Sequence, residues 1–323
     1  MSLLSLLLCL LLEQLRPLGP EPWPLRAFGH FADVVARNLN AGRRRHGALG
    51  WAVAVLPWVV VSDTVFYLLG RVHMIPALVW SVAVLYLALG VRQFSGGFTA
   101  VHLALREGRT DDARRHLADW TGLATREFGP AELSRVAIEH GLAGAHRRVF
   151  GVIAWALVLP AVLGNLLPGG LGLLLSGPGG ALLYRLSDVL AGRWGSRAGE
   201  EDFRAFGGFA ADAFRILDWV PARLTGLSFA IVGDFEDAVW CWRSQAAQWP
   251  DAQLGIVLAS GAGALGVRLG EALPADGRAQ HRPDLGVGDE ADPAHMGAAT
   301  GLVWRALVLW LLVIALMTVA SWV

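Results

Sequence analysis

Apolar residues gather in long runs along this chain, and polar segments rich in arginine separate the runs. The clearest internal run is 49–70, whose 22 residues form a helix of about 33 Å, enough to cross a hydrocarbon core of about 30 Å. A second run follows after only three residues, so the two are predicted to form a helical hairpin. The predicted membrane segments lie near 3–12, 49–70, 74–91, 149–167, 171–186 and 303–323.

Two of these predictions have special features. The pair at 149–167 and 171–186 contains many glycines together with Pro160, Pro168 and Pro178, which favours kinked helices or a re-entrant path over ideal spans. The run 3–12 has no basic residue before it and no small-residue cleavage site after it. We therefore interpret it as a short first membrane segment and not as a secretory signal peptide.

Arginine is concentrated in three polar segments, with six residues in 14–48, nine in 92–148 and ten in 185–302. Cytoplasmic loops of membrane proteins carry an excess of basic residues, so these segments are predicted to face the cytoplasm at a bacterial inner membrane. The turns at 71–73 and 167–170 and the C-terminus then face outward.

Two of the polar segments differ in character. Thr110, Asp111 and Asp112 predict the N-cap and acidic first turn of a solvated helix. The segment 274–302 is rich in proline, glycine and aspartate and has no apolar periodicity, which predicts a flexible tether. The fold class expected is an all-α polytopic integral membrane protein with amphipathic or re-entrant helices and cytoplasmic helical segments. Its predicted parts are a membrane domain at 1–273, the tether at 274–302 and a terminal transmembrane helix at 303–323.

Composition supports the membrane class and excludes several kinds of chemistry. Hydrophobic residues make up 54% of the chain and charged residues only 17%, and 27 basic residues balance 27 acidic ones, so no nucleic-acid partner is expected. All basic residues are arginine, and without lysine neither a P-loop nor a Schiff-base site is possible. Cys9 and Cys241 alone form no disulfide framework or zinc pattern, and the nine histidines are scattered.

One literal G-x-G-x-x-G pattern occurs, at Gly261, Gly263 and Gly266. A dinucleotide loop would need a following βαβ unit, whereas the chain here runs into the predicted tether. Because Ala262, Gly266 and Gly270 recur at four-residue spacing, we favour a small-residue face for close helix packing.

Several charged residues are candidates for chemistry. Asp63 lies inside a predicted span, where it is either functional or solvated near the interface. Arg223 suits bidentate contacts with a phosphate or carboxylate, although it could equally pair with Asp218 at a helix start. The run 224–232 that follows is too short to span and fits a re-entrant or core helix. Asp234 opens an acidic cluster that could bind Mg²⁺, but an acidic first helical turn is the commoner explanation.

Motifs in the first 270 residues resemble the CobD/CbiB family of cobalamin-biosynthesis membrane proteins, whose relatives include the AmpE regulators. The similar segments, in the order found in that family, are Arg16-Pro-Leu-Gly, Pro24-Leu-Arg-Ala-Phe-Gly, Arg43-Arg-Arg, Pro178-Gly-Gly-Ala-Leu-Leu-Tyr-Arg185, Phe206-Gly-Gly, Trp219-Val-Pro-Ala-Arg-Leu-Thr225 and Gly263-Ala-Leu-Gly-Val-Arg-Leu-Gly270. The resemblance implies an adenosylcobinamide-phosphate synthase, which joins an aminopropanol-type amine to a corrinoid carboxylate. ATP and Mg²⁺ are the implied cofactors, and the corrinoid, the lipid bilayer and a second copy or another membrane protein are the implied partners.

The chain departs from the family pattern at two places. Where active members carry E-N-T-S-D-G it reads Gly141-Leu-Ala-Gly-Ala-His-Arg-Arg148, and Phe214 and Arg215 replace a paired Asp. The nearest retained acid is Glu139. The resemblance therefore implies Glu139 and Asp218 as catalytic groups, Arg223 as the substrate or phosphate ligand and Asp234 as the metal ligand. A non-catalytic AmpE-like membrane sensor is the alternative, because Leu217-Asp-Trp-Val-Pro221 is similar to that branch.

Overall fold

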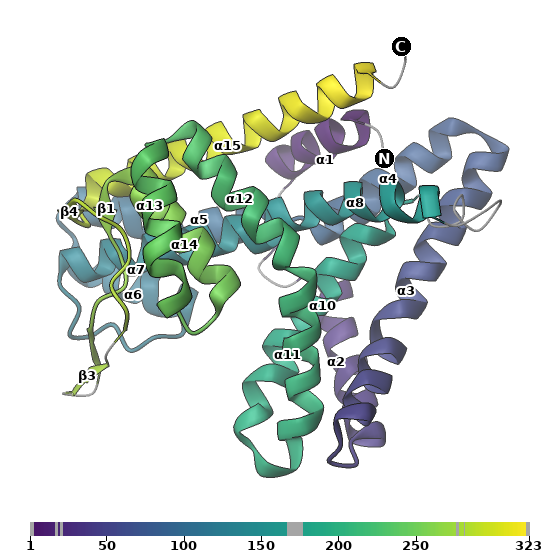
Figure 1. Cartoon of the computed structure of the whole chain (residues 1–323), viewed down its shortest axis with the longest axis horizontal. Coiled ribbons are helices and arrows are strands. Elements are labelled where there is room, and N and C mark those ends of the chain that lie inside the picture. Colours follow the sequence, from purple (N-terminus) through teal and green to yellow (C-terminus); the bar gives the residue numbers. More distant parts are fainter. Residues whose placement is uncertain are drawn as a thin grey trace. The chain divides into compact units, whose positions relative to one another are not determined.

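The structure, a computed structural model, describes residues 3–16, 19, 22–166, 177–275, 278–280 and 282–320. The chain divides into two compact units (Figure 1). The first unit comprises residues 1–90 and 147–221, and the second comprises residues 91–146 and 222–323. This division differs from the continuous membrane domain predicted over 1–273, because the chain passes between the two units three times.

The first unit is built from helices. Its principal helices are α1 (Leu3–Leu15), α2 (Trp23–Leu39), α3 (Arg44–Val72), α4 (Met74–Ala88), α8 (Gly151–Leu166), α10 (Gly179–Gly195) and α11 (Arg204–Leu217). Two short 3₁₀ turns, Ser196–Gly199 and Glu201–Phe203, connect α10 to α11. Within this unit α2, α3, α10 and α11 run side by side (Figure 1).

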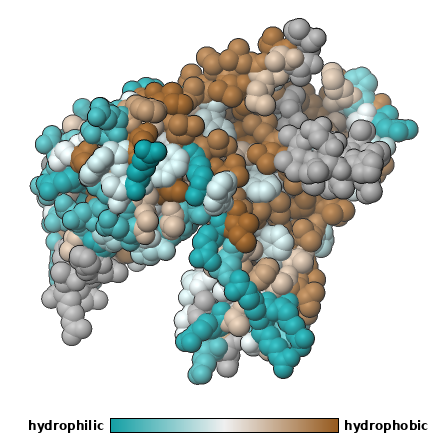
Figure 2. Space-filling model, viewed as in Figure 1, coloured by the Kyte–Doolittle hydropathy of each residue, from teal (hydrophilic) through white to brown (hydrophobic). Residues whose placement is uncertain are grey.

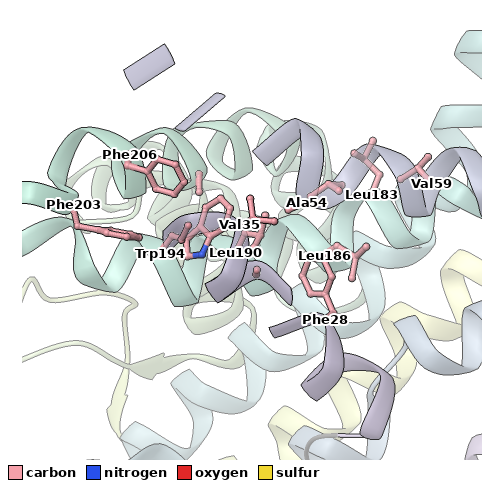
Figure 3. Packing of buried hydrophobic residues seen from close by; sticks show 14 of the residues in the cluster. Phe28, Val35, Ala54, Val59, Leu183, Leu186, Leu190, Trp194, Phe203 and Phe206 are labelled. Atoms are coloured by element: carbon pink, nitrogen blue, oxygen red, sulfur yellow. The ribbon is translucent and has the colours of Figure 1, made fainter. Parts of the chain in front are cut away.

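Aliphatic and aromatic residues together fill the core between these helices (Figure 3). Trp194 of α10 and Phe206 of α11 are fully buried, with ring centroids 4.9 Å apart. Gly50 lets α3 come close to them, since a Cβ atom there would lie 2.7 Å from the Phe206 ring. The small residue is therefore needed for the packing of α3 against α11.

An ion pair ties α2 to α10 near the polar end of the bundle. Arg193 donates from Nε and Nη2 to the two carboxylate oxygens of Asp33 at 2.9 and 2.8 Å. The hydrogen bond from Arg193 holds the pKa of Asp33 below its usual range. Both side chains are partly exposed, so we expect the pair to align the helices and to add little stability.

The second unit is also mainly helical. It contains α5 (Val91–Arg106), α6 (Thr110–Thr121), α7 (Pro130–Ala145), α13 (Phe235–Gln245), the 3₁₀ turn Ala246–Gln248, α14 (Ala252–Leu265) and α15 (Pro293–Ala320). Most of α12 (Trp219–Val232) belongs to it as well. The solvated helix predicted from Thr110 is α6, with Asp111 and Asp112 in its first turn.

The predicted flexible tether is wrong for much of 274–302. Leu273–Ala275 (β2) pairs with Arg278–Gln280 (β3), and Val267–Arg268 (β1) pairs with Asp289–Glu290 (β4). Leu269 and Leu285 exchange backbone hydrogen bonds of 2.7 and 2.9 Å between these pairs. Proline and glycine here shape a folded loop, and α15 already begins at Pro293.

Helix lengths confirm the membrane class. Among the described residues, three helices are long and apolar enough to cross a membrane, namely α3, the helix from Pro130 to Pro160, and α15. The predicted segments at 3–12 and 74–91 correspond to the shorter apolar helices α1 and α4, and His73 separates α3 from α4 as expected. Apolar side chains are exposed along α15, which Figure 2 shows in brown.

The predicted segment at 171–186 is only partly described. Residues 171–176 lie outside the described part of the chain, and the remainder opens α10, which carries Arg185, Asp188 and Arg193 and is not among the long apolar helices. The helix predicted over 149–167 is present as far as Leu166, and it continues without a break from α7 through a π-helical turn.

Candidate functional site

The four residues implied by the sequence fall in both units. Glu139, Arg223 and Asp234 lie in the second unit, and Asp218 ends α11 in the first. Glu139 and Asp218 are buried, Arg223 is half-buried and Asp234 is exposed.

Glu139 is the centre of a buried ionic network. Its Oε2 accepts a hydrogen bond from Arg282 Nη1 at 2.6 Å, and its Oε1 accepts from Arg282 Nη2 at 3.0 Å and from the Gly270 backbone N–H at 2.8 Å. This is the bidentate geometry for which a planar guanidinium is suited. Both carboxylate oxygens are therefore engaged in holding the loop that follows α14.

Arg282 reaches beyond this carboxylate. Its guanidinium also donates to the carbonyl oxygens of Gly270 and Glu271 at 2.6 and 3.1 Å and lies over the Trp249 ring, 5.6 Å from the centroid. The Arg282 guanidinium thus connects the loop that follows α14 to Glu139 on α7.

A second ion pair lies one turn earlier on the same face of α7. Arg135 pairs with Glu271 and donates to the Ala272 carbonyl oxygen at 3.1 Å. Because residues four apart on a helix are neighbours, Arg135 and Glu139 contact consecutive parts of the loop. Arg135 and Arg282 are thus each paired with a carboxylate, that of Glu271 and that of Glu139.

Asp218 occupies a different buried network, in the first unit. It accepts a 2.6 Å hydrogen bond from the hydroxyl of Tyr184, which has no exposed surface. Gly151 provides room for the phenol, since a Cβ atom at that position would lie 2.2 Å from the ring. Trp155 Nε1 donates to the carbonyl oxygen of Leu217 at 2.8 Å and fixes the end of α11.

Basic residues approach this network from a π-helical turn, His146–Phe150. The Arg147 guanidinium lies 5.6 Å from the centroid of the Phe214 ring, and on α10 Arg185 pairs with Asp188 at 2.9 Å. π-Helical turns occur often at functional sites. The first three residues of this turn, 146–148, belong to the stretch 141–148 that departs from the family motif.

Arg223 and Asp234 each make a hydrogen bond within the second unit. Arg223 Nη1 donates to Gln253 Oε1 on α14 at 2.9 Å. Asp234 is the N-cap of α13, where its Oδ1 accepts from the Asp237 backbone N–H at 3.0 Å. The acidic first turn that we considered the commoner explanation is therefore present. Within the described residues no group of three or more metal-binding side chains is gathered, so a Mg²⁺ role for Asp234 stays a prediction.

The glycine pattern is not a dinucleotide loop, because Gly261 and Gly263 lie inside α14 and no βαβ unit follows in the described residues. Gly263 packs closely, since a Cβ atom there would lie 2.4 Å from the Asp237 carbonyl oxygen. The prediction that Gly266 and Gly270 share a helix face is wrong. Helix α14 ends at Leu265, and Gly266 and Gly270 adopt φ values of +63° and +77° in the cap and the loop.

These features together define an all-α membrane protein with a buried ionic network around Glu139 and a buried hydrogen bond between Tyr184 and Asp218. The family model described as CobD/Cbib protein matches residues 3–303, and the chain belongs to this family. It is similar to the cobalamin biosynthesis protein CobD of Stutzerimonas stutzeri, with 35% identity over 96% of both chains. The corresponding protein of Chromobacterium violaceum is 33% identical over 96% of this chain and 94% of the relative. No solved structure matches. The chain is thus a membrane protein of cobalamin biosynthesis.

Proposed function

We propose that this protein performs the adenosylcobinamide-phosphate synthase step. The observation that carries the proposal is the extent of the match, since relatives named as cobalamin biosynthesis proteins align with 96% of the chain. The family model also includes every helix that bears Glu139, Asp218 and Arg223. Similarity over this extent supports an activity shared with these relatives.

The proposed reaction is an ATP-dependent amide ligation. A phosphoryl group passes from ATP to a corrinoid carboxylate, which gives an acyl phosphate and ADP. The nitrogen of an aminopropanol-type amine then attacks the acyl carbon, phosphate leaves, and the nitrogen gives up a proton. The chain's own residues must therefore bind an anion and accept a proton.

Arg223 and Asp218 are the residues that we assign to these two tasks. Arg223 presents a half-buried guanidinium, which suits a phosphate or carboxylate. Asp218 is buried and hydrogen-bonded to a phenol, a pair able to hold or pass a proton. Glu139 is better placed as a positioning residue, because both its oxygens hold Arg282 and Gly270. Mg²⁺ would accompany the nucleotide, and no step is assigned to it.

The location proposed is the bacterial inner membrane, with several crossings and the nucleotide on the cytoplasmic side. Arginine distribution supports this orientation, because it places α5, α6 and the start of α7 in the cytoplasm. Cellular ATP is then available to the second unit.

Genetic complementation tests the proposal. A host that lacks its own cobinamide-phosphate synthase and needs corrinoid for growth should grow when it expresses this chain. Membrane accumulation of the chain is measured in parallel by immunoblot. Absence of growth at normal accumulation would contradict the proposal and favour the AmpE-like sensor.

A further inference from the structure

We propose that α12 is embedded in the lipid bilayer as a helix that enters the membrane without crossing it. Four side chains form what we call the α12 apolar face: Leu224, Leu227, Ile231 and Phe235, the first residue of α13. Their exposed fractions are 39%, 43%, 54% and 57%. Steps of three and four residues place Leu224, Leu227 and Ile231 in one stripe along α12, with no polar side chain between them on that stripe, and Phe235 follows after the break at Gly233 and Asp234.

The polar side chains near the middle of α12 point away from this face and have partners. Thr225 is fully buried, and its hydroxyl lies 3.0 Å from His146 Nδ1. Ser228 is buried too, donates to the Leu224 carbonyl oxygen at 2.6 Å and accepts from Trp310 Nε1 at 2.8 Å. Polar groups satisfied on the inner side and an outer side that is wholly apolar are expected for a helix in hydrocarbon.

The bond between Ser228 and Trp310 sets the depth of α12. Trp310 lies within α15, one of the helices long and apolar enough to cross a membrane. It comes five residues after Arg305, the single charged residue near the start of that apolar stretch, or about 7.5 Å further along the helix. Ser228 must lie at the same depth, inside the hydrocarbon that surrounds α15.

Continuity with α15 identifies lipid as the occupant of the α12 apolar face. Val308, Leu312 and Leu316 of α15 are 59%, 54% and 62% exposed, and a membrane-crossing helix turns such residues to acyl chains. Because α12 is hydrogen-bonded to the middle of α15, the α12 apolar face lies at the depth of the same acyl chains. A second copy of the chain is the competing occupant.

Length and end charges show that α12 does not cross. Its 14 residues rise about 21 Å, which is less than the hydrocarbon thickness of about 30 Å. Arg223 near its start and Asp234 just beyond its end bracket the apolar stretch with charges that favour water or head groups. Gly226 supports the inner side, since a Cβ atom there would lie 3.0 Å from Ile256 Cγ2 and Ser260 Oγ of α14.

Spin-label accessibility in the full-length protein tests this proposal. Cys9 and Cys241 are replaced by alanine, and nitroxide labels are attached to Leu227→Cys or Ile231→Cys in lipid nanodiscs. Leu312→Cys on α15 is the matched lipid control, and Asp119→Cys on the exposed face of α6 is the aqueous control. Power saturation is measured with oxygen, which partitions into lipid, and with a nickel chelate, which stays in water.

Labels at 227 and 231 should match the label at 312, with high oxygen collision and loss of nickel collision relative to 119. Nickel collision equal to that at 119 would overturn the proposal, because the face would then be in water. A second copy of the chain on this face would give low collision with both reagents. It would also give dipolar broadening of the label spectrum, which mixing with unlabelled protein would remove. That result would overturn the proposal as well. The two positions serve as independent replicates if one variant fails to fold.

Discussion

The guanidinium of Arg282 holds the carboxylate of Glu139 through two hydrogen bonds, although 143 residues separate them in the sequence. This bond fastens the loop after α14 to α7 in a largely buried setting. Such a pair costs desolvation to form, yet it is costly to break from one side, because the remaining charge is left buried.

Removing one partner should therefore destabilise the second unit. We expect Arg282→Gln to lower the free energy of unfolding by about 3–5 kcal/mol, measured by denaturant titration in detergent micelles. Arg109→Gln is the control, because Arg109 pairs with Glu107 and Asp112 at the surface, where water screens the charges and the loss should be small. Equal effects of the two substitutions would show that the buried network contributes no special stability.

Substitutions at the two ends of the hydrogen bond between Tyr184 and Asp218 test its effect on stability and on catalysis separately. Tyr184→Phe keeps the packing against Gly151 but removes the hydroxyl, so we expect a loss of about 1–3 kcal/mol in unfolding free energy. Asp218→Asn keeps the size of the side chain and should accumulate in the membrane, yet it should abolish complementation because an amide cannot accept the amine proton. Normal growth with Asp218→Asn would remove Asp218 from the chemistry.

Arg223 is predicted to bind the substrate anion through two hydrogen bonds from its planar guanidinium group. Arg223→Lys keeps the charge but cannot reproduce bidentate contacts, so we expect corrinoid-dependent growth to be lost while membrane accumulation stays normal. Gln253→Ala is the matched control, because it removes one hydrogen-bond partner of Arg223 and leaves the guanidinium in place. Growth that persists with Arg223→Lys would show that charge alone is sufficient or that Arg223 is not a ligand.

Membrane orientation is tested by reporter fusions. Fusions that end after His46 and after Asp119 should be active only with a cytoplasmic reporter, because six and nine arginines lie in the surrounding segments 14–48 and 92–148. Alkaline phosphatase, which needs the periplasm, should be inactive at both sites. Phosphatase activity at either site would show that the segment faces the periplasm and would contradict the predicted orientation.

Hydropathy was sufficient to predict the helical hairpin of the first unit. The hairpin of α3 and α4 follows from two apolar runs with a three-residue break at 71–73. Hydropathy failed for 274–302, where the β-pairs are too short to show periodicity. It failed as well for Gly266 and Gly270, because four-residue spacing of glycines is the same for a helix face and for a cap followed by a turn.

The candidate residues were easier to find than their partners. Glu139 and Asp218 were selected by their positions relative to the family motifs in the sequence. Arg282 and Tyr184 could not be selected as their partners, because those contacts depend on how distant segments pack. The π-helical turn that contains Arg147 depends on hydrogen bonding along one helix, which residue types alone do not specify.

Direct ligation by the purified protein tests the central claim. The full chain in lipid nanodiscs is supplied with ATP, Mg²⁺, the corrinoid acid and an aminopropanol-type amine, and the corrinoid product is measured by mass spectrometry together with ADP. We predict amide product and ADP in equal amounts, and loss of both with Asp218→Asn in a variant that remains folded. Folded wild-type protein that yields neither product would contradict the assignment of this step to the chain.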